Sequence, residues 1–140
     1  MTYEVVLPPS VASVGAGRRL VAEALAAWDL DALAYTASLL TSEVLTNCVL
    51  HARTEMLLRV VRTGPSEVTI SVHDGSTHVP RRRRHAQDAT TGRGLELLDR
   101  LAQSWRVVAE DGGKTLTFTV GGDTDPWTAY ARVDWMDVEP

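Results

Sequence analysis

Glu43, Asn47 and His51 stand four residues apart within the run SEVLTNCVLH. In an α-helix, residues at this spacing stack along one side. A carboxylate and a carboxamide arranged in this way suit a magnesium-phosphate site, because the amide oxygen can ligate Mg²⁺ and the carboxylate can accept a proton. Ordinary solvated positions give the same pattern. Because no second His or Cys lies at ligand spacing, we interpret His51 as a structural helix histidine rather than a metal ligand.

A second candidate is the pair Asp74-Gly75, which follows the alternating apolar run VTISVH. A carboxylate at a strand end could accept a hydrogen bond from the amino group of adenine, and glycine would let the base approach the backbone. The alternative reading is a plain Asp-Gly turn.

A third candidate is the run Gly92, Arg93, Gly94 and Leu95, directly before a predicted helix. Glycines at such a junction expose backbone N–H groups to an anion, and the helix dipole favours negative charge there. Arg93 could reach a phosphate. The run matches neither the P-loop nor the dinucleotide fingerprint, and a glycine-rich helix start is the alternative.

Hydrophobic periodicity indicates the elements that must position these residues. The second helix has an inward apolar row of Leu33, Ala37, Leu40, Val44 and Cys48, and Asp29 or Asp31 could cap it. The order of elements predicts an α+β two-layer sandwich, with about three helices on one face of a mostly antiparallel or mixed sheet. The predicted strands are 3–7, 55–62, 67–73, 105–109 and 115–120, the helices are 14–28, 32–52 and 94–103, and a long loop covers 75–92.

Composition narrows the functional classes. The chain has 140 residues, a net charge of −4 and one cysteine, Cys48, which lies on an apolar row and suits a reducing compartment. Neither a secretory signal nor a membrane span is evident, so a cytoplasmic location without membrane contact is expected. The basic cluster Arg81–Arg84 is either a solvated loop segment or a contact for triphosphate or an acidic partner. Direct nucleic-acid binding is not expected from an acidic chain.

Taken together, the three segments resemble the motifs of the GHKL superfamily, which includes DNA gyrase, the ninety-kilodalton heat-shock chaperone, histidine kinases and MutL-type ATPases. The likeness is greatest to stand-alone anti-sigma-factor serine kinases and their actinobacterial relatives. Residues 39–52 resemble the N box, 74–75 the first glycine box and 92–95 the second, while 113–115 resemble the closing motif. One departure is that glycine follows Asp74 immediately, where the family often has Asp-x-Gly-x-Gly.

This resemblance implies a Bergerat-type ATP-binding fold over residues 1–120, with ATP and Mg²⁺ as ligands. Glu43 would be the general base and Asn47 the Mg²⁺ ligand. Asp74 and Gly75 would bind adenine, the 92–95 run would wrap the phosphates, and Thr115 would lie near the base. The implied function is an anti-sigma factor with serine/threonine kinase activity on an antagonist protein. The alternative is a nucleotide-gated binding module with little or no catalysis.

Residues 121–140 form an acidic segment with two tryptophans, which we treat as a separate C-terminal arm. The Asp125-Pro126 pair predicts a helix start, and the apolar residues after it could share one face. This arm either folds back on its own domain or docks a partner or a second copy, so a homodimer is left open. A detached histidine-kinase catalytic domain is disfavoured, because the residues before Glu43 leave no room for a dimerising helical hairpin.

Overall fold

The computed structural model of the chain describes residues 1–76, 89–110 and 112–122, and of residues 89–94 it describes the backbone alone. Five strands form one sheet in the order β1-β2-β3-β5-β4. Every neighbouring pair in it is antiparallel. The strands are β1 Thr2–Leu7, β2 Met56–Gly64, β3 Glu67–Asp74, β4 Ser104–Glu110 and β5 Gly113–Gly121.

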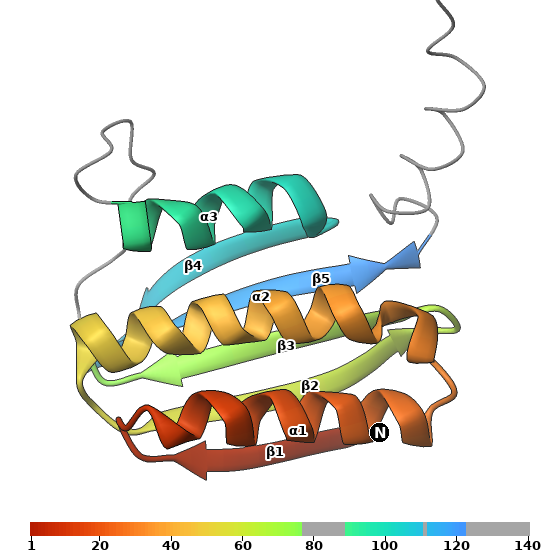
Figure 1. Cartoon of the computed structure of the whole chain (residues 1–140), viewed down its shortest axis with the longest axis horizontal. Coiled ribbons are helices and arrows are strands. Elements are labelled where there is room, and N and C mark those ends of the chain that lie inside the picture. The colour runs from red at the N-terminus through yellow and green to blue at the C-terminus, as the bar shows by residue number, and fades with distance from the viewer. Residues whose placement is uncertain (77–88, 111, 123–140) are drawn as a thin grey trace, which may run out of the picture.

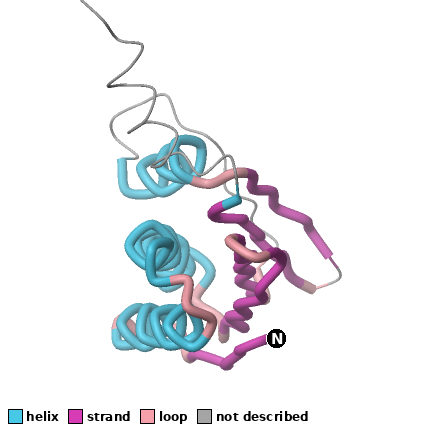
Figure 2. Tube along the Cα trace, turned by 90° about the vertical axis from the view of Figure 1, so that its right-hand side faces the viewer, coloured by secondary structure: helices cyan, strands magenta, loops and turns pink. Residues whose placement is uncertain are grey.

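The helices lie on one face of this sheet (Figures 1 and 2). They are α1 Ala12–Ala27, α2 Ala34–Asn47 and α3 Ala89–Leu101. A short 3-10 turn, η1 Asp31–Leu33, leads into α2, and a π-helical turn, η2 Cys48–Ala52, continues it. The predicted α+β two-layer sandwich and the two predicted hairpins, β2–β3 and β4–β5, are therefore confirmed.

Alternation in the strands explains how the layers join. In β3 every second residue is buried, and in β5 Leu116, Phe118 and Val120 are buried while the threonines between them are partly exposed. The buried set meets the predicted inward row of the second helix, all of which is buried. The largest fully buried side chains from the two layers include Leu25, Leu40, Leu45, Leu58, Ile70 and Phe118.

The sequence prediction is wrong at two helix starts. Neither Asp29 nor Asp31 caps α2, since the turn η1 intervenes and α2 begins without a side-chain cap; Asp29 itself has a φ of 58°. The third helix begins at Ala89 instead of Gly94, so residues 92–94 lie within its first turns. Two glycines in so short a run disfavour a helix interior, which misled the prediction.

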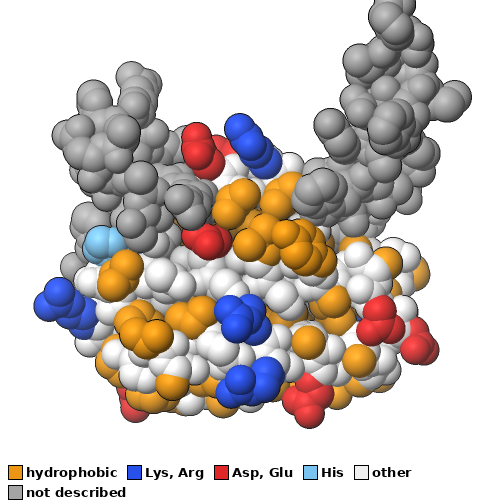
Figure 3. Space-filling view, in the orientation of Figure 1, with side chains coloured by type: hydrophobic (Ala, Val, Ile, Leu, Met, Phe, Trp, Pro, Cys, Tyr) orange, Lys and Arg blue, Asp and Glu red, His pale blue; other side chains and the backbone are white. Residues whose placement is uncertain are grey.

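The exposed side of the helix layer is less uniform than the core. In Figure 3, hydrophobic side chains gather over α3, where Leu97 and Leu101 are only partly buried. On the sheet side, Trp105 lies between the layers and its indole N–H donates to Asp99 of α3 at 2.8 Å. This bond ties the last turns of α3 to β4.

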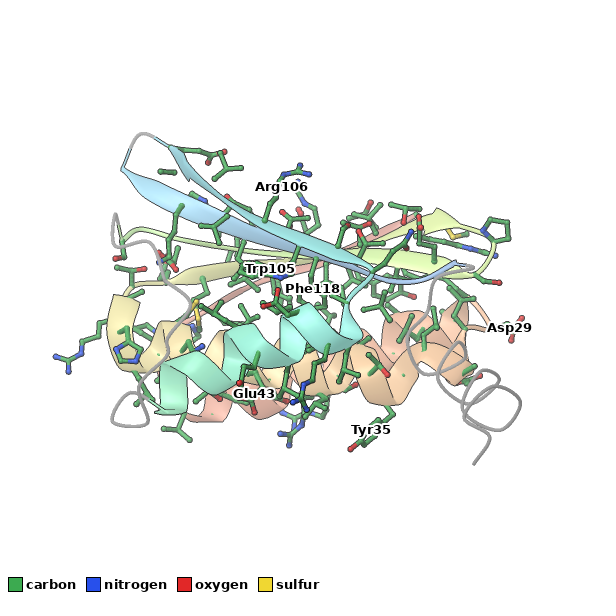
Figure 4. All side chains as sticks on the ribbon, turned by 90° about the horizontal axis from the view of Figure 1, so that it is seen from above. Asp29, Tyr35, Glu43, Trp105, Arg106 and Phe118 are labelled. Carbon is green, nitrogen blue, oxygen red and sulfur yellow. The ribbon has the colours of Figure 1, made fainter. Side chains whose placement is uncertain are left out.

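Phe118→Ala should lower the free energy of unfolding by about 3–5 kcal/mol, because it opens a cavity among fully buried side chains. The matched control is Arg106→Ala on the neighbouring strand, whose exposed side chain lies on the opposite face of the sheet (Figure 4). That change should stay within about 0.5 kcal/mol. Urea unfolding followed by circular dichroism measures both, and equal effects would contradict the assignment of faces.

Candidate functional site

Four chain segments that carry candidate residues meet at one end of the molecule. The end of α2, the end of β3, the start of β5 and the start of α3 all lie at the left of Figure 1. The β3–β5 pairing aligns Asp74 with Lys114, and α2 contacts α3. Asn47 at the end of α2 and Asp74 at the end of β3 therefore lie at the same end of the fold as the start of α3.

Asp74 is the most deeply buried charged residue described, with 1% of its surface exposed. Both of its carboxylate oxygens accept from the Lys114 ammonium, at 2.9 and 2.8 Å. The backbone N–H of Ser76 donates to Oδ1 at 2.8 Å. An ionised carboxylate is stable in an apolar environment only when it is paired and hydrogen-bonded in this way.

The π-helical turn supplies the third partner of this carboxylate. Arg53 N–H bonds to the Cys48 carbonyl at 3.0 Å, five residues back, and Arg53 takes the left-handed conformation with a φ of 58°. The turn presents the Cys48 thiol to Asp74 Oδ2, with the two atoms 3.4 Å apart. Burial first, and then the charge of Asp74, raises the pKa of the Cys48 thiol from 9.0 to about 12, so the thiol stays protonated and donates.

Asn47 immediately precedes this turn, and its Oδ1 is buried without a hydrogen-bond partner among the described residues. A buried polar atom without a partner costs free energy, and Thr41 Oγ1 shares this state, so the orphaned oxygen makes Asn47 a candidate for holding a bound group. Amide oxygen is a ligand that Mg²⁺ accepts. The Asn47 amide oxygen is therefore chemically compatible with the predicted role as a Mg²⁺ ligand. Within the same described ranges, no cluster of three or more His, Cys, Asp or Glu could hold a metal by itself.

Glu43 lies one turn before Asn47 on α2, in the helix layer (Figure 4). Its side chain is partly buried, and no hydrogen bond or ion pair holds its carboxylate within the part of the chain that is described. His51 is not brought to this group. It lies in the π turn, which breaks the i, i+4, i+8 row, and its side chain is exposed.

The Asp-Gly turn is held by a residue that the sequence analysis missed. Gly75 N–H donates to Thr54 Oγ1 at 2.8 Å, which ties the turn to the segment after the π turn. A Cβ at Gly75 would meet Thr54 only at ordinary contact distance. Glycine is therefore not required there by the fold, which leaves the approach of a ligand as a reason for it.

Thr115 does not join the site. Its hydroxyl pairs with His73 Nδ1 at 2.9 Å, on the sheet face opposite Asp74. The side chain that faces Asp74 is that of Lys114, one residue earlier. The alternation Leu116, Phe118 and Val120 in the sequence could have shown this, because a strand that buries these residues also turns Lys114 inward.

The 92–95 run forms part of α3, and Leu95 is 2% exposed and belongs to the core. The side chain of Arg93 and the cluster Arg81–Arg84 lie outside what the structure describes, as does the arm from residue 123 onward. None of the helices described is both long enough and apolar enough to span a bilayer.

Comparisons with known proteins agree with this geometry. A family model described as "Histidine kinase-like ATPase domain" matches residues 7–120. Among solved structures, the chain is similar to the RsbU and RsbW domains of Rv1364c from Mycobacterium tuberculosis, with a TM-score of 0.61 and 19% identity. That match covers 85% of this chain and 32% of the other, and at this identity it shows a shared fold. A search of curated proteins found no match.

The thiol of Cys48 should react with a disulfide reagent at pH 8 at least about a hundredfold more slowly in the folded chain than in urea, because thiolate is the reacting form. The rate should keep rising toward pH 12 as long as the fold persists. Because Cys48 is the only cysteine of the chain, the absorbance of the released reagent reports on this thiol alone. The Cys48→Ala variant gives the background rate. Rapid reaction of the folded chain near neutral pH would refute the buried, proton-donating thiol.

Proposed function

The chain belongs to the histidine kinase-like ATPase domain family, and on that premise we propose that it is a Mg-ATP-binding regulatory protein that phosphorylates an antagonist protein. By the same resemblance, it sequesters a regulatory partner of the sigma-factor class when the antagonist is absent. Its working compartment is the cytoplasm. Protein partners and the serine/threonine specificity rest on the motif likeness, while the nucleotide site also rests on the geometry.

One observation carries this proposal: a buried carboxylate and a buried, unsatisfied amide oxygen lie at the same end of the fold. Asp74 would accept a hydrogen bond from the base once one of its present donors is displaced, and Asn47 Oδ1 would be a ligand atom for the cation. A nucleotide with its magnesium ion offers both complements in one ligand. The start of α3 lies at the same end (Figure 1), where its first backbone N–H groups and helix dipole favour phosphate.

When bound, Mg²⁺ would neutralise charge on the phosphates, and Asn47 is the described residue that would hold it. Asn47 is a neutral ligand, so phosphate oxygens and water must supply the remaining donors, as is usual for this ion.

We assign the proton transfer to Glu43. Its carboxylate is not engaged by another described side chain and lies one helical turn from Asn47. In the proposed reaction, the hydroxyl oxygen of the antagonist's serine forms a bond to the γ-phosphorus, the bond from that phosphorus to the bridging oxygen of ADP breaks, and Glu43 takes the hydroxyl proton. Such transfer depends mainly on positioning and charge neutralisation, which a small domain can supply.

Glu43→Gln should keep the Kd for Mg-ATP within about threefold while lowering the rate of phosphoryl transfer by at least about a hundredfold, since only the base is lost. Asp74→Ala should lose nucleotide binding itself. Calorimetry with Mg-ATP and transfer of labelled phosphate to candidate antagonist proteins measure the two quantities. Undiminished transfer in the Glu43 variant would rule out its role as base. Binding without any transfer in the native chain would favour the nucleotide-gated module.

Asn47→Ala should weaken ATP binding in the presence of Mg²⁺ by about tenfold or more, because it removes a ligand to the ion. With EDTA present, the variant and the native chain should bind ATP with the same weak affinity. Thr46→Ala, a neighbour on the same helix, serves as the control and should match the native chain in both conditions. Equal loss with and without Mg²⁺ would show that Asn47 acts on the fold or on the nucleotide rather than on the metal.

A further inference from the structure

The carboxylate of Asp74 has no acceptor position left for a ligand. Two carboxylate oxygens offer about four lone-pair sites. The Lys114 ammonium donates to both oxygens, Ser76 N–H donates to Oδ1 and the Cys48 thiol donates to Oδ2. Each oxygen therefore already accepts two hydrogen bonds from the chain's own groups. An amino group on a base must displace one of these donors before Asp74 can receive it.

The ammonium, in contrast, has a donor to spare. Lys114 carries three N–H groups, and its contact with the two oxygens of Asp74 engages at most two of them. The third has no partner among the residues that the structure describes. The Lys114 side chain is also the more accessible of the pair, at 10% exposure against 1% for Asp74. An intact pair therefore offers an incoming base a hydrogen-bond donor rather than an acceptor.

We propose that Lys114 determines which purines this subsite accepts, and that it admits 6-oxo purines such as guanine and hypoxanthine beside adenine. The inference rests on the proposed function, since it takes Asp74 as the residue that meets the base. A lone carboxylate rejects a 6-oxo base because acceptor faces acceptor, and unpaired buried acceptors discriminate strongly. Lys114 removes this repulsion by placing a cation where the base oxygen would arrive.

Binding of adenine and binding of a 6-oxo purine then disrupt different numbers of the hydrogen bonds around Asp74. The oxygen of the 6-oxo base accepts the third N–H, and the ion pair stays whole. The amino group of adenine must take the place of one N–H of Lys114 on the carboxylate. The same lysine therefore weakens the binding of ATP and strengthens the binding of GTP or ITP. Its effect appears in the ratio of the Kd values for ATP and for GTP or ITP.

Cys48 is the other donor that adenine could displace, because a thiol is a weak donor and its bond to Asp74 is the longest of the four, at 3.4 Å. If Cys48 yielded instead, Lys114 would not set the preference. Cys48→Ala is therefore the matched control: it removes a donor from the same carboxylate but leaves the ion pair in place.

The test is the Kd of Mg-ATP, Mg-GTP and Mg-ITP for the full chain, measured by calorimetry on the native protein, Lys114→Met and Cys48→Ala. In the native protein, GTP and ITP should bind within about tenfold of ATP. Lys114→Met should shift the ratio of Kd values at least about tenfold toward ATP, whereas Cys48→Ala, which frees one lone-pair site on Asp74 but keeps the cation, should shift it by a clearly smaller factor. A general loss of protein stability weakens the binding of all three nucleotides together and does not change the ratio of their Kd values.

If Lys114→Met does not fold, the three Kd values of the native protein still test whether 6-oxo purines are accepted. Lys114→Arg then tests whether a retained cation preserves the ratio of the Kd values. GTP and ITP binding a hundredfold or more weaker than ATP would overturn the inference and leave the proposed function intact. A ratio that moves with Cys48 but not with Lys114 would also overturn it. No binding of any of the three nucleotides would remove the proposed function together with the inference.

Discussion

The site depends on one buried charge pair. Asp74 can lie almost fully buried only because Lys114 meets it from the next strand, and the register of β3 with β5 sets this meeting. A pair of this kind contributes little net stability compared with apolar side chains of the same size, but loss of one partner typically costs about 3–5 kcal/mol. That loss is a large part of the 5–15 kcal/mol by which domains are stable. The position of Lys114 on β5 is therefore tightly constrained by the fold as well as by any ligand.

The close approach of the two strands at this point requires Gly113. A Cβ there would collide with the backbone oxygen of Asp74, so only glycine fits at the position where β5 begins beside Asp74. Lys114 then follows as the first inward side chain of the strand, and the apolar residues after it fix the same face to the helices. The sheet and the core thus position the charged group, while the helix layer contributes Asn47 and the Cys48 thiol.

Periodicity in the sequence was enough to predict the layers, the hairpins and the inward row of α2, because burial on one face leaves a regular pattern. The types and spacing of the N-box and Asp-Gly residues were enough to nominate them as candidate site residues. Lys114 and Thr54 were missed, since each acts through a tertiary contact: Lys114 across two strands, and Thr54 through a hydrogen bond to Gly75. The start of α3 was misplaced because local propensity argues against two glycines in a helix, whereas packing of Leu95 and Leu98 supports it.

The π turn after α2 also sets a length. Its wider winding brings the chain to Arg53, which turns it sharply, and Thr54 then reaches across to the backbone of Gly75. Cys48 at the start of this turn and Thr54 just beyond it hold the two sides of the same Asp-Gly corner. The number of residues between them therefore acts as a spacer. Deletion of one residue between Cys48 and Thr54 could restore ordinary α-helical winding. It would, however, break either the Cys48 or the Thr54 hydrogen bond to the Asp-Gly turn.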